Sequence, residues 1–121
     1  MKKILLIEDE ELLRILYREE LQEEGYEVLL AADGIEGLKI LEKTKVDLVI
    51  TDLHMPRMGG LDTLSHILGL RRKLPVIIYT GHPEYKTNFM SWSADAYLIK
   101  SSDLSELKAK IKELTSGSMP N

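Results

Sequence analysis

A regular alternation of short apolar runs with helical patterns is the feature of this sequence that most constrains its fold. The apolar runs lie at 4–7, 27–31, 46–51, 75–79 and 96–99, too short for buried helices and often β-branched, which predicts five buried strands. Segments with apolar residues three or four positions apart predict helices at about 10–23, 61–70, 84–92 and from about 103 onward. A further helix is marked by Ile35, Leu38, Ile40 and Leu41.

Five strand–helix units in a row predict an α/β domain in which helices cover both faces of a parallel sheet. Two layouts fit: the flavodoxin-like strand order 2-1-3-4-5 and a Rossmann-like half. The second is disfavoured because the turn after the first strand, Glu8-Asp9-Glu10-Glu11, holds no glycine and would repel a pyrophosphate. We therefore predict a flavodoxin-like (βα)5 three-layer sandwich with the order 2-1-3-4-5.

The composition fits one domain. The chain has 121 residues, 44% hydrophobic and 30% charged, and we expect a folded unit over 1–115 with a flexible tail or linker stub at 116–121. A net charge of −4 argues against nucleic acid as a direct partner, and the absence of cysteine excludes disulfides and thiolate sites. The first apolar run stops at Glu8, and no run approaches the roughly 18 residues of a membrane span, so a cytoplasmic protein is expected.

Charged and polar residues follow the predicted strands where each strand ends. Glu8 and Asp9 follow the first strand, Asp52 the third, Thr80 the fourth and Lys100 the fifth. In the order 2-1-3-4-5 the first and third strands are neighbours, which gathers three carboxylates at the edge where such sheets bind ligands. Two like charges about 4 Å apart repel by roughly 4 kcal/mol at an effective dielectric near 20, so the cluster predicts a bound cation.

The residue types in this cluster suit phosphoryl chemistry. Oxygen ligands with room for water favour Mg²⁺ over Ca²⁺, and Mg²⁺ held in this way usually bridges to a phosphate. Lys100 offers a positive charge and Thr80 a hydroxyl for phosphate oxygens. Asp52, at the end of the middle strand, can itself act as the nucleophile and form an aspartyl-phosphate.

Five motifs stand in order along the chain: Ile-Glu-Asp-Glu at 7–10, Thr-Asp-Leu-His-Met-Pro at 51–56, Gly60-Leu61, Tyr-Thr-Gly at 79–81 and Ala-Tyr-Leu-Ile-Lys at 96–100. With these motifs the sequence resembles, from residue 3 to about residue 114, the receiver domains of two-component response regulators. Each motif is weak alone, but the ordered set is highly specific.

The resemblance implies a phosphorelay signalling module that catalyses only its own phosphorylation and dephosphorylation. It implies that Asp52 accepts a phosphoryl group from a phosphohistidine on a sensor histidine kinase or a histidine phosphotransfer protein. Mg²⁺ or Mn²⁺ would be bound by Asp9, Asp52 and the backbone carbonyl of His54, with Glu8 acting through water. The phosphoryl oxygens would be bound by the side chains that end the fourth and fifth strands, Thr80 and Lys100.

The resemblance also implies a switch. Tyr97 would turn inward when Thr80 moves toward the phosphate, which changes the face made by the strand at 96–99, the helix at 84–92 and the last helix. That face is expected to bind a downstream effector, whose identity the sequence does not give, and a dimer that forms on phosphorylation is left open. His54 and His82 stand where family members tune the lifetime of the phosphoryl group; the alternative is that both are solvated loop histidines.

One position departs from the family pattern. Ser101 follows Lys100 where the family usually carries a proline with a cis peptide bond. A cis bond before serine costs about 3–4 kcal/mol, so we expect a trans or strained bond and a displaced Lys100 loop around a working site. A Lys100 side chain that points away from Asp52 would contradict this expectation.

Two other functions remain as alternatives. A Mg²⁺-dependent phosphohydrolase of the haloacid-dehalogenase type needs a second acid two residues after the nucleophile, and His54 stands there instead. A receiver-like domain that is never phosphorylated could act only in docking, an alternative that Ser101 leaves open. Incubation with a small-molecule phosphodonor and Mg²⁺ separates the three functions. Stable incorporation that is lost in Asp52→Asn indicates a receiver domain, turnover indicates a phosphohydrolase, and neither indicates a docking domain.

Overall fold

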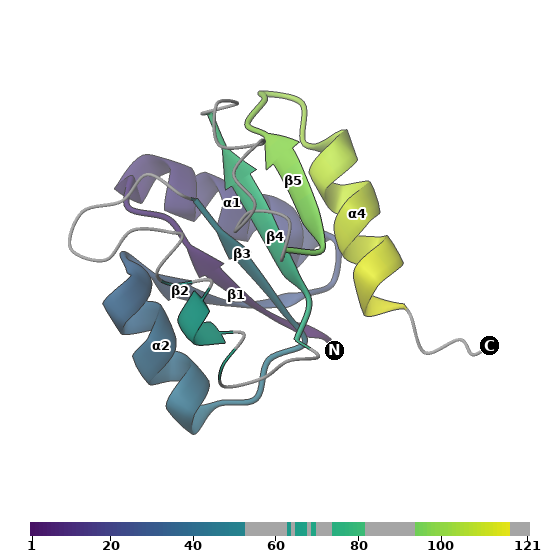
Figure 1. Cartoon of the computed structure of the whole chain (residues 1–121). Coiled ribbons are helices and arrows are strands. Elements are labelled where there is room, and N and C mark those ends of the chain that lie inside the picture. Colours follow the sequence, from purple (N-terminus) through teal and green to yellow (C-terminus); the bar gives the residue numbers. More distant parts are fainter. Residues whose placement is uncertain (53–62, 64, 68, 70–73, 82–93, 117–121) are drawn as a thin grey trace.

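The computed structural model describes residues 1–52, 63, 65–67, 69, 74–81 and 94–116. Its centre is a single five-stranded sheet in the order β2-β1-β3-β4-β5, with parallel pairing throughout (Figure 1). The strands are β1 (Lys3–Ile7), β2 (Glu27–Ala31), β3 (Leu48–Thr51), β4 (Val76–Thr80) and β5 (Ala96–Ile99). The predicted flavodoxin-like order is confirmed, and the Rossmann-like half is not the arrangement found.

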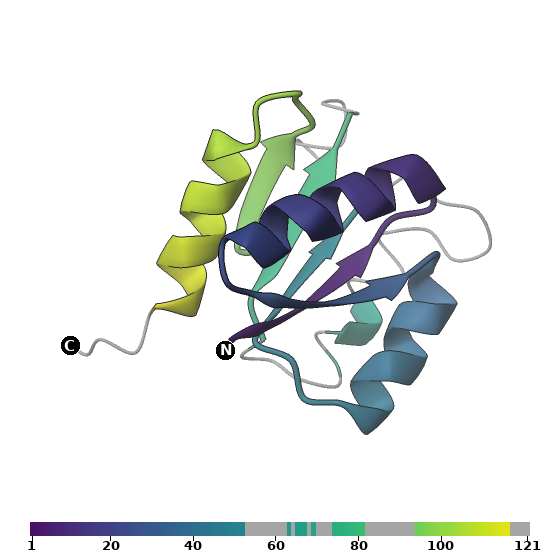
Figure 2. The ribbon, with the colours of Figure 1, turned by 180° about the vertical axis from the view of Figure 1, so that it is seen from behind.

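Helices cover both faces of the sheet. α1 (Glu11–Glu23) and α4 (Ser105–Thr115) pack on one face, and α2 (Gly34–Lys43) packs on the other together with the helical residues at 63, 65–67 and 69 (Figures 1 and 2). The strands at 27–31 and 96–99 have the predicted bounds, whereas β3 begins at 48 rather than 46. The predicted helix at 84–92 and the loop at 53–60 lie outside the described residues. None of the described helices has the length and apolar character needed to cross a membrane.

The β1 strand shows how the pleat divides the core in two. Ile4 and Leu6 face α1 and α4, while Leu5 and Ile7 face α2, and all four are at most 2% exposed. A strand buried on both faces explains why its sequence is continuously apolar rather than alternating. The helices complete the two clusters with residues spaced at helical intervals, such as Tyr17, Leu21, Leu107 and Ile111 on one side and Leu41 on the other.

Local sequence signals set where α1 ends and where α2 begins. Gly25 ends α1 with a φ of 97°, a conformation that favours glycine, and its N–H donates to the carbonyl of Gln22 at 3.0 Å. Asp33 caps α2 by accepting from the backbone N–H of Glu36 at 2.9 Å, and the Glu36 side chain accepts from the N–H of Ala32 at 2.9 Å. These turns bring the chain back to the sheet so that all five strands end at one edge.

Candidate functional site

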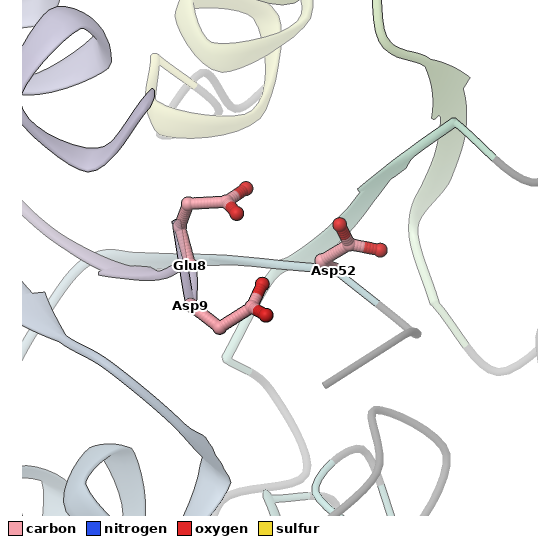
Figure 3. A group of neighbouring side chains, drawn as sticks. All are labelled: Glu8, Asp9 and Asp52. Carbon is pink, nitrogen blue, oxygen red and sulfur yellow. The ribbon is translucent and has the colours of Figure 1, made fainter. Parts of the chain in front are cut away.

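Three carboxylates meet at the carboxyl edge of β1 and β3. Ile7 pairs with Thr51 in the sheet, so the residues that follow, Glu8 and Asp52, lie at the same level. The side chains of Glu8, Asp9 and Asp52 point into a common space, with one oxygen from each within 4.8 Å of the others (Figure 3). The three acids that were selected from the sequence because they follow neighbouring strands thus lie together in the structure.

Backbone hydrogen bonds hold two of these acids in place. The Glu8 N–H donates to the carbonyl of Ala31 on β2 at 3.0 Å, and the Asp52 N–H donates to the carbonyl of Ile7 at 3.4 Å. The Arg14 guanidinium, one turn into α1, donates to the carbonyl of Glu8 at 2.7 Å. Glu8 and Asp52 are only 2% and 6% exposed, whereas the Asp9 side chain lies in an exposed position.

Lys100 reaches the two buried carboxylates from the end of β5. Its ammonium Nζ lies 2.6 Å from Asp52 Oδ2 and 2.7 Å from Glu8 Oε1. Its backbone N–H donates to the carbonyl of Thr80 at 2.8 Å, which extends the β4–β5 ladder by one residue. Within the described segments every peptide bond is trans, including Lys100–Ser101, and the Lys100 side chain points toward Asp52. A displacement of this loop relative to other family members stays a prediction.

Burial and mutual contact set the charges of Glu8 and Lys100. Burial raises the pKa of the Glu8 carboxyl, and the hydrogen bonds from Lys100 and from the Glu10 N–H oppose that rise only in part. Burial alone would lower the pKa of the Lys100 ammonium, but its bonds to Asp52 and Glu8 outweigh burial and raise that pKa above its ordinary value. Lys100 thus stays charged and offsets one of three carboxylate charges, which leaves a local excess suited to a divalent cation.

The other predicted residues divide between the described and the undescribed parts of the chain. Thr80 is the last residue of β4 rather than the first beyond it, and it is fully buried. In the β4–β5 register Thr80 pairs with Ile99 and Ile78 pairs with Tyr97, so Thr80 and Tyr97 lie on the same face of the sheet. Tyr97 is half-buried against the apolar cluster on the α2 side. The backbone carbonyl of His54 and both histidines, His54 and His82, lie outside the described residues.

Sequence reasoning missed the contacts of Tyr79, which appeared there only as part of the Tyr-Thr-Gly motif. The Tyr79 hydroxyl contacts the backbone of Ser101, and its ring meets the ring of Tyr17 edge-on at 5.5 Å and 65°. Burial raises the pKa of the Tyr79 hydroxyl. One signal was available: a buried tyrosine in an otherwise aliphatic strand needs a hydrogen-bond partner for its hydroxyl.

The sheet order defines a doubly wound α/β domain, and its carboxyl edge carries an acidic cluster beside a lysine that could hold a cation. The sequence model of the response regulator receiver domain matches residues 4–112, and the chain belongs to this family. The chain is therefore a response regulator receiver domain, and receiver domains are signalling domains.

Solved structures agree closely with this fold. The response regulator TrrA of Thermotoga maritima, crystallised in complex with Mg²⁺–BeF, superposes with a TM-score of 0.92 at 42% identity over 94% of this chain and 99% of that one. TrrA in complex with the histidine kinase ThkA gives a TM-score of 0.89 at 42% identity, covering 94% of this chain and 98% of that one.

Sequence relatives are longer proteins. The transcriptional regulatory protein PdtaR of Mycobacterium tuberculosis is 38% identical over 109 residues, 88% of this chain and 53% of that protein. The alkaline phosphatase synthesis transcriptional regulatory protein PhoP of Bacillus subtilis is 31% identical over 115 residues, 93% of this chain and 48% of that protein. The chain thus spans about half the length of these curated relatives.

Proposed function

We propose that Asp52 accepts a phosphoryl group from a phosphohistidine and that a divalent cation is required for the transfer. The observation that carries the proposal is the position of the Lys100 ammonium, within 2.7 Å of both Glu8 and Asp52, two of the three carboxylates that gather at this edge of the sheet. Phosphoryl transfer needs positioning and neutralisation of charge more than covalent assistance, and this group of side chains offers both.

The donor set fits Mg²⁺ or Mn²⁺. All three side chains offer oxygen ligands, and the exposed Asp9 leaves one side of the cluster open to water, as Mg²⁺ sites require. Asp9, Asp52 and the backbone carbonyl of His54 would hold the ion, and Glu8 would act through water. When bound, the ion offsets negative charge on the phosphoryl oxygens. The complex of TrrA with Mg²⁺–BeF supports this assignment.

The transfer forms one bond and breaks one bond. A carboxylate oxygen of Asp52 attacks phosphorus in line with the P–N bond of the phosphohistidine. The P–N bond breaks, and the imidazole, protonated on its other nitrogen, leaves as the neutral base with the bonding electron pair. Lys100 and Thr80 bind the phosphoryl oxygens. Attack of water on phosphorus later breaks the new P–O bond and regenerates the Asp52 carboxylate.

A switch follows from the shared face of Thr80 and Tyr97. Movement of the Thr80 hydroxyl toward the phosphoryl group opens space on this face, and Tyr97, half-buried two residues before the end of β5, turns inward to fill it. The surface of β5 and α4, together with the segment 84–92, then changes and binds a downstream effector or a second copy of the chain.

The partners follow from the same chemistry. A sensor histidine kinase or a histidine phosphotransfer protein supplies the phosphoryl group, which the TrrA–ThkA complex supports for a similar receiver domain. Contact with nucleic acid or membrane is not part of the proposal, and the setting is the cytoplasm. The receiver domain of this proposal comprises residues 1–115; the predicted tail beyond residue 116 lies outside the described residues.

The test is incubation with phosphoramidate, with and without Mg²⁺, followed by intact-mass spectrometry. The wild type should gain one stable phosphoryl group only with Mg²⁺, and Asp52→Asn should gain none. Asp47→Asn is the matched control, because the Asp47 carboxylate accepts from the Lys3 N–H at 2.8 Å at the opposite end of the sheet. Continuous phosphate release without an adduct would indicate a phosphohydrolase, and no reaction would indicate a docking domain.

Lifetime tuning by His54 and His82 is a separate hypothesis. If either imidazole assists or hinders the attacking water, the decay of the phosphorylated form depends on pH around the imidazole pKa. Replacing both histidines with asparagine should then flatten the decay rate between about pH 5.5 and 8. An unchanged pH profile in the double variant would refute it.

A further inference from the structure

We propose that the Tyr79 hydroxyl is a positioning group for Lys100: it holds the backbone at Ser101 so that the lysine ammonium stays on Asp52. The inference rests on the proposed function, because its consequence is the rate at which Asp52 accepts a phosphoryl group. It gives a role to a residue that is not among the proposed cation ligands or the proposed phosphoryl-binding residues.

The first support is a pair of hydrogen bonds made by one hydroxyl. Tyr79 Oη accepts from the Ser101 N–H and donates to the Ser101 carbonyl oxygen, each over 3.3 Å. A phenolic hydroxyl can do both at once. Each bond is long and weak alone, but together they restrain the peptide groups on both sides of Ser101. One of those groups is the Lys100–Ser101 peptide, directly beside the residue that carries the ammonium.

The second support is the rigidity of Tyr79 compared with the segment that it contacts. Tyr79 is 3% exposed, pairs with Leu98 in the sheet, and packs its ring against that of Tyr17 on α1. Ser101 is exposed and lies in the connection between β5 and α4. The last ladder bond of β5 is the one from Lys100 N–H to Thr80. Beyond that bond, the Tyr79 hydroxyl is the next restraint on the backbone.

The third support is the residue type at position 101. Proline has no N–H, so a proline there could not donate to Tyr79. Ser101 supplies that N–H, and the tyrosine on β4 supplies its acceptor. The contact therefore requires a residue other than proline at position 101. A lysine side chain is long and flexible. Restraining the backbone beside Lys100 therefore limits how far its ammonium moves from the carboxylates of Asp52 and Glu8.

The test variant is Tyr79→Phe, which keeps the ring and its contact with Tyr17 and removes only the hydroxyl. Transfer from phosphoramidate to Asp52 should slow about tenfold, in line with the sensitivity of such reactions to small misplacements. Binding of Mg²⁺ should stay as tight or become tighter, because a loosened Lys100 competes less for the carboxylates. A merely structural defect would weaken both, so the split between the two readouts identifies positioning.

Two further variants serve as controls. Ser101→Ala keeps both backbone groups that Tyr79 contacts and loses only the bond that Ser101 Oγ accepts from the Asp103 N–H, so it should react close to the wild-type rate. In a Lys100→Met background, adding Tyr79→Phe should cause no further slowing, because Tyr79 acts through Lys100. A wild-type rate in Tyr79→Phe, or full additivity with Lys100→Met, would overturn the inference.

A readout that needs no phosphoryl transfer keeps this inference separate from the proposed function. Failure of the proposed function would appear as no adduct on the wild type. The side-chain NMR signals of Lys100 and the exchange rate of the Ser101 amide report the restraint directly. In Tyr79→Phe the Lys100 signals should shift and the Ser101 amide should exchange faster. Unchanged signals and exchange would overturn the positioning role even if Asp52 is phosphorylated.

Discussion

Lys100 Nζ and Asp52 Oδ2 lie 2.6 Å apart, although 48 residues separate them in the chain. The contact joins the end of β5 to the end of β3 across the end of β4, and it exists only because three parallel strands end at one edge. The same ammonium also contacts Glu8, so one positive charge serves two buried carboxylates. The stability of the site without a cation therefore depends on this lysine.

Replacing Lys100 with methionine should destabilise the protein. The change leaves two buried carboxylates without their counter-charge, and breaking a buried pair in this way costs about 3 kcal/mol. Mg²⁺ should restore part of the loss, because a cation can take the place of the ammonium. Urea unfolding with and without Mg²⁺ measures both effects. Lys110→Met is the control: among the described residues, Lys110 pairs with Glu113 at the surface, and the change should alter stability by less than about 0.5 kcal/mol.

Replacing Asp9 with asparagine should stabilise the protein in the absence of a divalent ion, the opposite of the effect of Lys100→Met. The Asp9 carboxylate adds a third negative charge to the cluster, so Asp9→Asn should raise the melting temperature when no divalent ion is present. The same change should reduce the stabilisation that Mg²⁺ gives, because one ligand is lost. Thermal unfolding across a Mg²⁺ titration checks both signs. Glu11→Gln removes an exposed acid in the first turn of α1 and should leave the Mg²⁺ effect intact; an equal loss there would mean that the response is general screening.

The sequence indicated the strand ends well because burial on both faces leaves a strong apolar signal. It selected Glu8, Asp9 and Asp52 because the order of neighbouring strands alone brings them together. The strand bounds were less certain where polar residues have partners: Asp47 lies outside β3 because its carboxylate accepts from the Lys3 N–H. No local pattern marks such a partner.

The detailed contacts of the site were beyond sequence reasoning for the same reason. That one ammonium bridges Glu8 and Asp52, rather than pairing with one of them, depends on side-chain reach across three strands. The bonds between Tyr79 and the Ser101 backbone depend on how the connection after β5 folds back. A hydrogen bond to a backbone N–H excludes only proline as the partner, so the sequence can indicate that a buried Tyr79 needs a partner but not which residue supplies it.

Tyr17 should make the protein sensitive to alkali. Burial raises the pKa of its hydroxyl from 10.0 to about 12, so the unfolded chain loses this proton at a lower pH than the folded one. The stabilising effect is complete below pH 10, decreases as the pH rises toward about 12, and amounts to roughly 1–3 kcal/mol. Denaturant unfolding between pH 9 and 12 measures the decline. Tyr17→Phe should flatten it in part, while an unchanged slope would show that other groups cause it.

A side chain at Gly37 should destabilise the protein while Ile7 keeps its full length. A Cβ at Gly37 would lie 2.5 Å from Ile7 Cδ1 and 3.0 Å from Ile7 Cγ1, and Ile7 is 1% exposed. Alanine would gain up to about 1 kcal/mol in helix propensity, but overpacking a buried site costs about 1–3 kcal/mol. We therefore expect Gly37→Ala to lower the free energy of unfolding by about 1 kcal/mol.

The test of this close packing is a double-mutant cycle with Ile7→Val, which removes Cδ1. Alone, Ile7→Val should cost about 1 kcal/mol, but combined with Gly37→Ala it should relieve the overlap, so the double variant should be more stable than the sum predicts. Leu5→Val is the matched control, because Leu5 lies on the same strand face but is not among the atoms nearest that Cβ. If both cycles are additive, the approach of α2 to β1 is not what requires glycine at position 37.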